Sequence, residues 1–176
     1  MKKYLIKNLL LKCYKITNII TDYIQFFVFN ILRHINKKKY IVCDIDNTIS
    51  DTWRQLYLNE SIHDAKPIDK IIKYINSYEN CQYIFLSSRP IHEYLRTISW
   101  LRLNVRKKFL LILTSSPKGK IKYLKIIEES IIVYLDDLSY NHENGTVKYY
   151  HDEIKIINKM NMPYIGYKEI DYIKNL

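Results

Sequence analysis

From residue 40 onward, short apolar runs alternate with segments of helical periodicity, and this alternation restricts the fold more than any other feature of the chain. The apolar runs are 40–45, 82–86, 109–113 and 131–135, with a shorter fifth candidate at 147–150. Continuous apolar runs of this length are typical of parallel strands that are buried on both faces. The sequence therefore predicts an α/β fold of the three-layer, Rossmann-like kind with a central parallel sheet.

The segments between these runs place apolar residues three and four positions apart, as amphipathic helices do. We expect helices at 67–78, 91–101, 120–129 and 153–160. The chain of 176 residues is 48% hydrophobic and contains only three Gly and four Pro, which argues against collagen-like, linker-like and low-complexity sequence. Its length suits one compact domain with an appendage.

Residues 1–39 are that appendage. Apolar residues recur in steps of three and four from Leu5 to Ile35 without an intervening Gly or Pro, which predicts one long amphipathic helix. Of the 28 Lys and Arg residues and 18 Asp and Glu residues of the chain, this segment holds nine bases and a single acid, Asp22. Most of the net charge of +10 therefore belongs to a helical extension, 1–39, and little of it to the α/β domain, 40–176.

Several environments remain open for the N-terminal helix. It can pack on the domain or on a second copy of itself, or it can lie on an anionic membrane surface, and crossing a membrane is the least favoured alternative. A membrane-spanning helix needs about 20 mostly apolar residues, and polar residues such as Asp22 and Gln25 interrupt this one. The three cysteines form no close pair, so we expect reduced thiols and a cytoplasmic protein, peripheral to the membrane if the helix lies on one.

Polar side chains follow three of the predicted strands, at the edge where parallel sheets bind ligands. A lysine pair opens the helix before the fourth strand. These candidate site residues are Asp44, Asp46, Thr48, Ser87, Ser88, Arg89, Lys118, Lys120, Asp136 and Asp137. Mg²⁺ takes oxygen ligands from carboxylates, and a carboxylate can also attack phosphorus to form an acyl phosphate. The pattern therefore predicts a site for a metal and a phosphate.

The order of these motifs resembles that of the haloacid dehalogenase-like (HAD) phosphohydrolase superfamily over residues 40–164. The segment Asp44-Ile45-Asp46-Asn47-Thr48 matches the family's DxDxT motif, and Asp136-Asp137 resembles the paired acids of its fourth motif. Ser87 resembles the second motif. Lys120 fits the third best, with Lys118 as the alternative. The resemblance implies a HAD domain that hydrolyses phosphate monoesters with Mg²⁺ through an aspartyl-phosphate.

The resemblance also implies a role for each acid. Asp44 is the expected nucleophile and a Mg²⁺ ligand. Asp46 is the expected general acid and then base, with its backbone carbonyl near the metal. Asp136 or Asp137 completes the metal shell, and the sequence leaves open which of the two does so.

The remaining motif residues have expected roles around the phosphate. Thr48 fixes the loop after the first motif. Ser87 and Lys120 hold the transferring phosphoryl oxygens and offset the developing charge. Ser88 and Arg89 are further candidates for the phosphate site.

The segment between the first and second motifs is too short for a large lid, so we expect a capless member with an open site. Trp53 and Tyr57 are candidates to stack on a base or sugar, or to pack beneath a short flap. The segment from Ser87 to Leu101 is similar to the phosphatase domain of polynucleotide kinase/3′-phosphatase enzymes. The chain departs from that family in lacking a GxxxxGK[ST] loop and an Arg within 110–116.

Residues 89–125 hold ten bases against one acid, Glu93, and such a basic wall suits a polyanion. A nucleotide, a sugar phosphate and a nucleic-acid end all remain open as substrate. A function of another class also remains open, namely a non-catalytic adaptor whose helix recruits a membrane or a protein partner.

Overall fold

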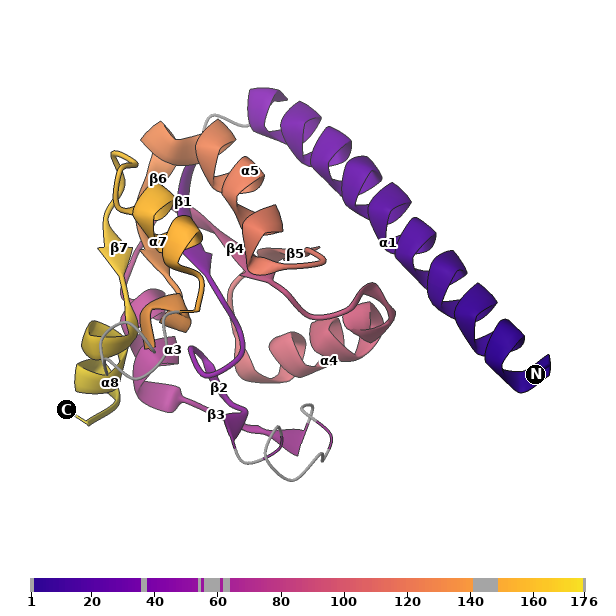
Figure 1. Cartoon of the computed structure of the whole chain (residues 1–176). Helices are drawn as coiled ribbons and strands as arrows, with labels where there is room; N and C mark the ends of the chain where they lie inside the picture. Colours follow the sequence, from indigo (N-terminus) through magenta and orange to yellow (C-terminus); the bar gives the residue numbers. More distant parts are fainter. Residues whose placement is uncertain are drawn as a thin grey trace.

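The computed structural model describes residues 2–35, 38–53, 55, 61, 64–140 and 149–175. Its centre is a five-stranded parallel sheet with the order β5-β4-β1-β6-β7 (Figure 1). The strands are β1 (Lys39–Cys43), β4 (Cys81–Ser87), β5 (Phe109–Leu113), β6 (Ile131–Leu135) and β7 (Tyr164–Ile165). A separate antiparallel pair is formed by β2 (Ser50–Asp51) and β3 (Lys66–Pro67). The predicted α/β fold with a central parallel sheet is confirmed.

Helices cover both faces of the sheet. One buried cluster joins α3, α4 and α8 to the sheet, and a second joins α1, α5 and α7 to its other face. The helices are α1 (Lys2–Ile35), α3 (Asp69–Asn76), α4 (Tyr94–Asn104), α5 (Pro117–Ile127), α7 (His151–Ile157) and α8 (Tyr167–Asn175). Short 3-10 turns are η2 (Ile91–Glu93), η3 (Glu128–Ser130) and η4 (Asp137–Ser139).

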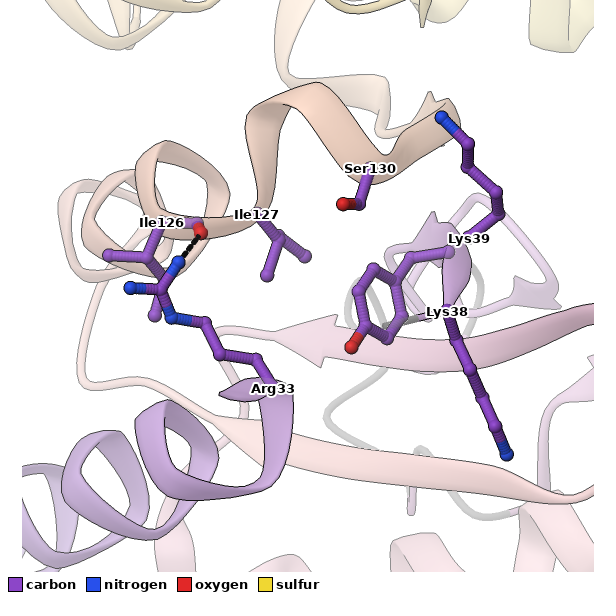
Figure 2. Close-up of a pocket in the computed structure, with 7 residues that line it drawn as sticks. Arg33, Lys38, Lys39, Ile126, Ile127 and Ser130 are labelled. Atoms are coloured by element: carbon purple, nitrogen blue, oxygen red, sulfur yellow. Dashed lines mark hydrogen bonds between the residues drawn. The ribbon is translucent and has the colours of Figure 1, made fainter. Parts of the chain in front are cut away.

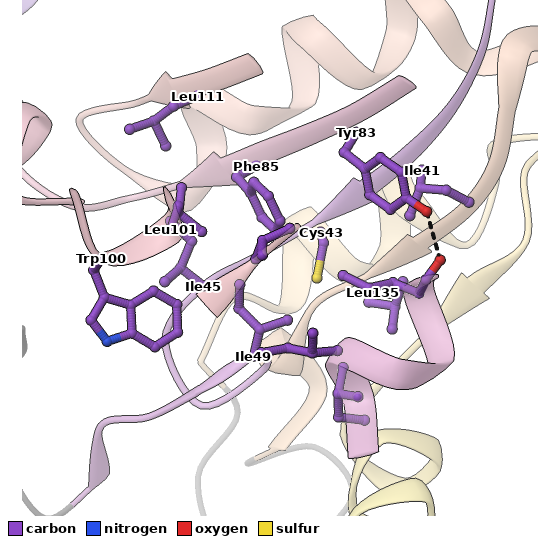
Figure 3. Packing of buried hydrophobic residues seen from close by; sticks show 14 of the residues in the cluster. Ile41, Cys43, Ile45, Ile49, Tyr83, Phe85, Trp100, Leu101, Leu111 and Leu135 are labelled. Atoms are coloured by element: carbon purple, nitrogen blue, oxygen red, sulfur yellow. Dashed lines mark hydrogen bonds between the residues drawn. The ribbon is translucent and has the colours of Figure 1, made fainter. Parts of the chain in front are cut away.

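The central strand β1 shows why these residues form a buried parallel strand. Ile41 and Cys43 contribute to the cluster under α3 and α4, whereas Tyr40 and Val42 contribute to the cluster under α5. All four side chains are at most 4% exposed. Figure 3 shows the first of these clusters, in which Trp100 of α4 lies at one end. Burial on both faces explains the unbroken apolar run in the sequence.

The four longer apolar runs form the strands that the sequence predicts, but the fifth strand lies elsewhere. Residues 147 and 148 of the predicted run lie outside the described residues, and Tyr149-Tyr150 forms a turn. The fifth strand is β7, and the sequence analysis predicted neither β7 nor α8. Two residues are too short to show a periodicity, and β7 is defined only by its pairing with β6.

The second half of α1 packs on the domain, and Figure 1 shows its N-terminal half extending away from the other elements. Phe26 and Phe29 of α1 contact the ring of Tyr123 in α5, at centroid distances of 5.3 and 5.6 Å. The Gln25 amide pairs with the backbone of Leu113, accepting from its N–H at 3.2 Å and donating to its carbonyl at 3.1 Å. Gln25 thereby covers the last residue of the edge strand β5. Within the described part of the chain, no helix combines the length and apolar character needed to cross a bilayer.

Candidate active site

A cavity of about 420 Å³ lies at the carboxyl edge of the sheet, where β1, β4 and β6 end. Eight of the ten candidate residues line it. They are Asp44, Asp46, Ser87, Ser88, Arg89, Lys120, Asp136 and Asp137. The structure therefore gathers side chains from four separate segments into one polar cavity, which is where parallel sheets usually bind ligands.

Three acids form the centre of this cavity. Asp44, Asp136 and Asp137 each offer a carboxylate oxygen, and these oxygens lie within 4.8 Å of one another. Asp44 and Asp136 are 5% and 0% exposed. Hard oxygen donors at this spacing fit a divalent cation such as Mg²⁺. The side chain of Asp46, also expected near the metal, is not part of this group among the described residues.

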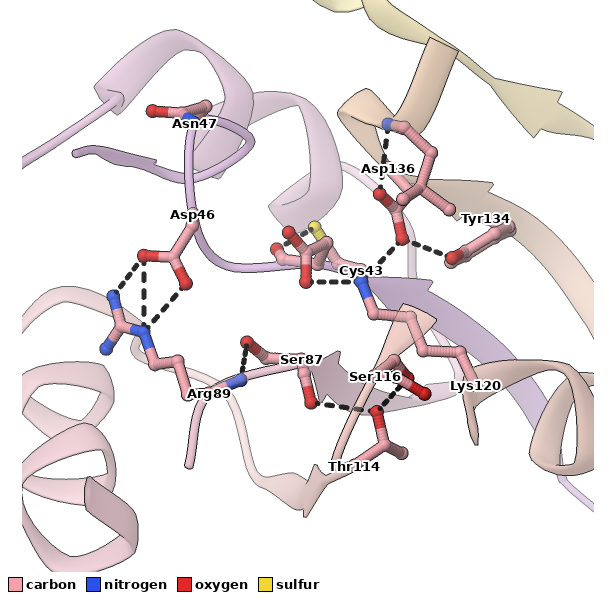
Figure 4. Close-up of polar contacts among 12 residues, drawn as sticks. Cys43, Asp46, Asn47, Ser87, Arg89, Thr114, Ser116, Lys120, Tyr134 and Asp136 are labelled. Carbon is pink, nitrogen blue, oxygen red and sulfur yellow. Dashed lines mark hydrogen bonds and ion pairs between the residues drawn. The ribbon is translucent and has the colours of Figure 1, made fainter. Parts of the chain in front are cut away.

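Lys120 joins two of these acids. Its Nζ donates to Oδ1 of Asp44 and to Oδ2 of Asp136, both at 2.7 Å, and its side chain is buried (Figure 4). Lys118, the alternative, is exposed and does not line the cavity. Between the two lysines, the geometry therefore favours Lys120 for a role in this cavity.

The start of α5 brings Lys120 to the edge of the sheet. Ser116 caps the helix by accepting from the N–H of Gly119 at 3.4 Å, and Pro117 occupies the first turn. A Cβ on Gly119 would lie 3.0 Å from the Cβ of Thr114, so only glycine allows this close approach without displacement. Lys120 follows directly and points into the cavity.

The acids and the lysine shift one another's protonation. Burial raises the pKa of Asp44 well above its usual range, with the Lys120 ammonium opposing this effect and the neighbouring acids adding to it. Burial, reinforced by Asp136, raises the pKa of Asp137 to about 7. Burial alone lowers the pKa of Lys120, but Asp136 and Asp44 outweigh it and the net pKa is raised. The cavity thus holds an excess of negative charge that a cation or an added proton can relieve.

Tyr134 is a site residue that the sequence analysis missed. This fully buried side chain of β6 donates its hydroxyl hydrogen bond to Oδ2 of Asp136. Burial, followed by the charge of Asp136, raises the pKa of Tyr134 well above its usual range, so the phenol remains a donor. Residues i and i+2 of an extended chain share a face. The position of Tyr134 two residues before Asp136 could therefore have indicated that the two side chains lie together.

Asp46 and Arg89 form an ion pair at the opposite side of the cavity. Nη2 of Arg89 lies 2.8 Å from Oδ1 of Asp46, and Nε lies 3.0 Å from Oδ2. Arg89 is 3% exposed, and its other terminal nitrogen reaches Oγ1 of Thr97 at 3.3 Å. This bidentate geometry is the arrangement that guanidinium groups also make with phosphate.

The hydroxyl residues differ in their placement. Ser88 lines the cavity, and its buried Oγ has no hydrogen-bond partner among the described residues. Ser87 is buried, and its Oγ accepts from the N–H of Arg89 at 3.2 Å. Thr48 is fully buried in the turn after β1 and does not line the cavity, and its Oγ1 has no hydrogen-bond partner among the described residues.

Aromatic side chains surround the mouth of the cavity. Trp53, Tyr140, Tyr149 and Tyr150 line it, and the rings of Trp53 and Tyr140 are 5.1 Å apart. Trp53 is 47% exposed and Tyr149 is 56% exposed, so neither is packed in a core. Tyr57, the other aromatic candidate, lies outside the described residues.

The basic residues of 89–125 do not gather at this mouth. Arg89 and Lys120 pair with acids inside the cavity, and Nζ of Lys122 lies 2.6 Å from Oδ2 of Asp22 in α1. Lys118 and Lys125 line a different cavity together with two acids of α7. Of the ten bases, Arg89 and Lys120 are those that line the cavity among the described residues.

Comparisons with known proteins add little. No protein-family model and no curated protein matches the chain. A solved structure described as "Structure of Pnkp1/Rnl/Hen1 complex" matches with 19% identity and a TM-score of 0.49. The match covers 74% of this chain and 46% of that one, so the chain spans less than half the length of its structural neighbour. A similarity of this strength assigns no function.

Proposed function

We propose that the protein is a Mg²⁺-dependent phosphate monoester hydrolase of the HAD type, with residues 40–176 as a capless catalytic domain. The observation that supports this proposal most is the buried group of Asp44, Asp136 and Asp137 bridged by Lys120 at the carboxyl edge of the sheet. A structural ion-pair network explains a paired lysine and acid, but not a third carboxylate in an open polar cavity. The order of the four motifs in the sequence adds independent support.

In the proposed reaction, a carboxylate oxygen of Asp44 attacks phosphorus and the bond between phosphorus and the ester oxygen breaks. This step leaves an aspartyl-phosphate, and the departing alcohol takes a proton from Asp46. In the second step Asp46 takes a proton from water, whose oxygen attacks phosphorus and releases inorganic phosphate and free Asp44. Splitting the hydrolysis into two steps is the usual advantage of covalent catalysis.

Lys120, Ser87 and Ser88 stabilise the phosphoryl group in this proposal. The Lys120 ammonium, held by two acids, carries positive charge that offsets the charge on the transferring oxygens. Ser88 supplies a hydroxyl with no other partner among the described residues. Mg²⁺ held by Asp44, Asp136 and Asp137 would reduce the repulsion between an anionic nucleophile and an anionic phosphate.

The proposed role of Asp46 in proton transfer requires that its ion pair with Arg89 opens. A carboxyl group that donates a proton cannot at the same time accept two hydrogen bonds in a bidentate ion pair with Arg89. We therefore propose that Arg89 exchanges Asp46 for a phosphate oxygen when substrate binds. The exchange frees Asp46 for proton transfer and couples catalysis to the presence of a phosphate.

The substrate class remains a nucleotide, a sugar phosphate or a nucleic-acid end. The aromatic rings at the mouth of the cavity, Trp53 among them, favour a substrate with a planar base, because exposed aromatic side chains are the usual stacking partners of bases.

The test is phosphate release with and without Mg²⁺ from wild type and Asp44→Asn. The substrates are an aryl phosphate, nucleotides, sugar phosphates and a 3′-phosphorylated oligonucleotide. We expect metal-dependent turnover that falls by about a thousandfold or more in Asp44→Asn, because no nucleophile remains. Asp69→Asn, an exposed acid at the start of α3, is the matched control and should retain turnover. Absence of turnover from folded wild type on every substrate would favour the adaptor alternative.

A further inference from the structure

The helix α1 has two different faces along its second half. One face packs on the domain through side chains spaced three and four apart, which contact α5 and β5. These side chains are Asp22, Gln25, Phe26, Phe29 and Arg33. Packing on the domain therefore accounts for one side of the helix only.

The other face is apolar and exposed. Eight large apolar side chains of α1 are between 45% and 70% exposed. They are Ile16, Ile19, Ile20, Tyr23, Ile24, Phe27, Val28 and Ile31. Their spacing places them on one broad stripe along the helix. Single exposed apolar residues are ordinary, but a contiguous stripe of this kind marks a binding surface.

An apolar groove continues this stripe toward the sheet. It has a volume of about 370 Å³ and lies between α1, β5 and the start of α4. Ile24 and Val28 belong to both the groove and the stripe. The surface that needs an apolar partner is therefore wider than the helix itself.

The charge along α1 is positive at both ends of the stripe. Lys2, Lys3, Lys7, Lys12 and Lys15 precede it in the sequence. Arg33, Lys38 and Lys39 line a cavity of about 330 Å³ at its other end, where Lys38 points away from Arg33 (Figure 2). Asp22, the one acid of α1, is paired with Lys122 and Tyr123 of α5. No carboxylate of the helix is therefore left to attract a basic partner.

We propose that the stripe of α1 lies in the plane of an anionic lipid bilayer, with its apolar side chains in the headgroup and acyl boundary. A second copy of the helix fits less well. Parallel pairing would place the five lysines of residues 2–15 beside those of the second copy, and neither copy offers an unpaired acid of the helix to oppose them. An anionic bilayer matches the apolar stripe and the flanking bases at once.

This orientation also places the cavity of the α/β domain near the surface. Gln25 contacts the last residue of β5, and Asn18 and Thr21 lie beside Pro90 and Thr114, which follow β4 and β5. The first half of α1 therefore extends beyond the edge of the sheet that carries the cavity. The inference does not depend on the proposed catalytic residues and holds whether or not the domain hydrolyses phosphate esters.

The test is sedimentation of the full chain with vesicles of phosphatidylcholine, with and without about one-third phosphatidylserine. We expect binding to the anionic vesicles that weakens between about 0.1 M and about 1 M salt, where the Debye length falls from about 10 to about 3 Å. The double variant Ile20→Glu with Phe27→Glu should bind at least about tenfold more weakly. Two apolar side chains that would enter the bilayer are then replaced by carboxylates, which the anionic headgroups repel.

Leu95→Glu with Leu103→Glu is the matched control, since both leucines are exposed on α4 at 76% and 85%. It should bind the anionic vesicles as wild type does. Equal binding by both double variants, or no wild-type binding to anionic vesicles, would overturn the proposal. So would a concentration-dependent dimer in sedimentation velocity that Ile20→Glu with Phe27→Glu abolishes, because the partner would then be a second copy.

Discussion

The carboxyl edge of the sheet and the outer face of α1 depart from ordinary folding in opposite ways. At the sheet edge the protein buries charge, with Asp44, Asp136 and Lys120 all at most 5% exposed. On α1 it exposes apolar surface, with Phe27 at 66% and Tyr23 at 70%. Buried charge costs free energy unless it is paired, and exposed apolar area costs free energy until a partner covers it.

The two regions also differ in how their residues are assembled. The acids of the cavity are separated by about half of the chain and meet only because parallel strands end at one edge. The apolar residues of α1 are neighbours in the sequence and share a face by helical periodicity alone. A binding site can therefore be built by the topology of the whole sheet or by the periodicity of a single helix. Mutations that disturb long-range packing should weaken the first kind of site, and mutations on one helix face should weaken the second.

The largest expected effect comes from breaking the charge pairing at the sheet edge. Lys120→Met would leave Asp44 and Asp136 buried without their shared cation, and removal of one partner from a buried ion pair costs about 3–5 kcal/mol. Urea unfolding measures this loss, and added Mg²⁺ should restore part of it. Lys118→Met, an exposed position one half-turn earlier, should change the unfolding free energy by less than about 0.5 kcal/mol. Equal losses of unfolding free energy in both variants would show that Lys120 does not form the buried ion pairs with Asp44 and Asp136.

The second prediction compares the two faces of α1 with one side chain. Phe29 is 3% exposed and packs on Tyr123, whereas Phe27 is 66% exposed. Phe29→Ala should lower the unfolding free energy by about 3 kcal/mol, and Phe27→Ala should change it by less than about 0.5 kcal/mol without lipid. Thermal unfolding followed by circular dichroism gives both values. A comparable loss in the two variants would mean that α1 docks differently.

The third prediction concerns the Asp46–Arg89 pair. If Arg89 leaves Asp46 for a phosphate oxygen, Arg89→Lys keeps the charge but loses the bidentate geometry. We expect KM to rise and kcat to fall, with kcat/KM lower by about 10- to 100-fold. Arg96→Lys, on the exposed side of α4, serves as the control and should leave both constants unchanged. A purely structural role for Arg89 predicts lower stability with kinetics near those of wild type.

The fourth prediction concerns the dependence of stability on pH. Burial raises the pKa of Asp137 to about 7, whereas an unfolded Asp titrates near about 4. The stabilising contribution of its proton is therefore complete below about pH 4 and is lost as the pH rises through about 7. Without metal, Asp137→Asn should gain in melting temperature relative to wild type at about pH 7.5 and lose most of that gain near about pH 5. A difference that stays constant over this range would show that Asp137 does not take up a proton on folding.

The class of fold and the candidate site residues could be predicted from the sequence. Its apolar runs matched β1, β4, β5 and β6 because a strand buried on both faces must be apolar throughout. Asp44, Ser87 and Asp136 could be singled out because each follows such a run. The basic, periodic character of α1 was equally visible, since helical spacing needs no knowledge of the rest of the chain.

Which of these residues lie together depends on the packing of elements that are far apart in the sequence. The structure favours Lys120 over Lys118 because the cap at Ser116 and the close approach at Gly119 direct one of the two lysines into the cavity. Tyr134 donates a hydrogen bond to Asp136, and the side chain of Asp46 pairs with Arg89; neither contact was predicted from the sequence. The packing of α1 also pairs Asp22 with Lys122 and Tyr123 of α5, which leaves the outer face of α1 without a negative charge. Local periodicity fixes the face that a side chain occupies, whereas long-range packing fixes what that face meets.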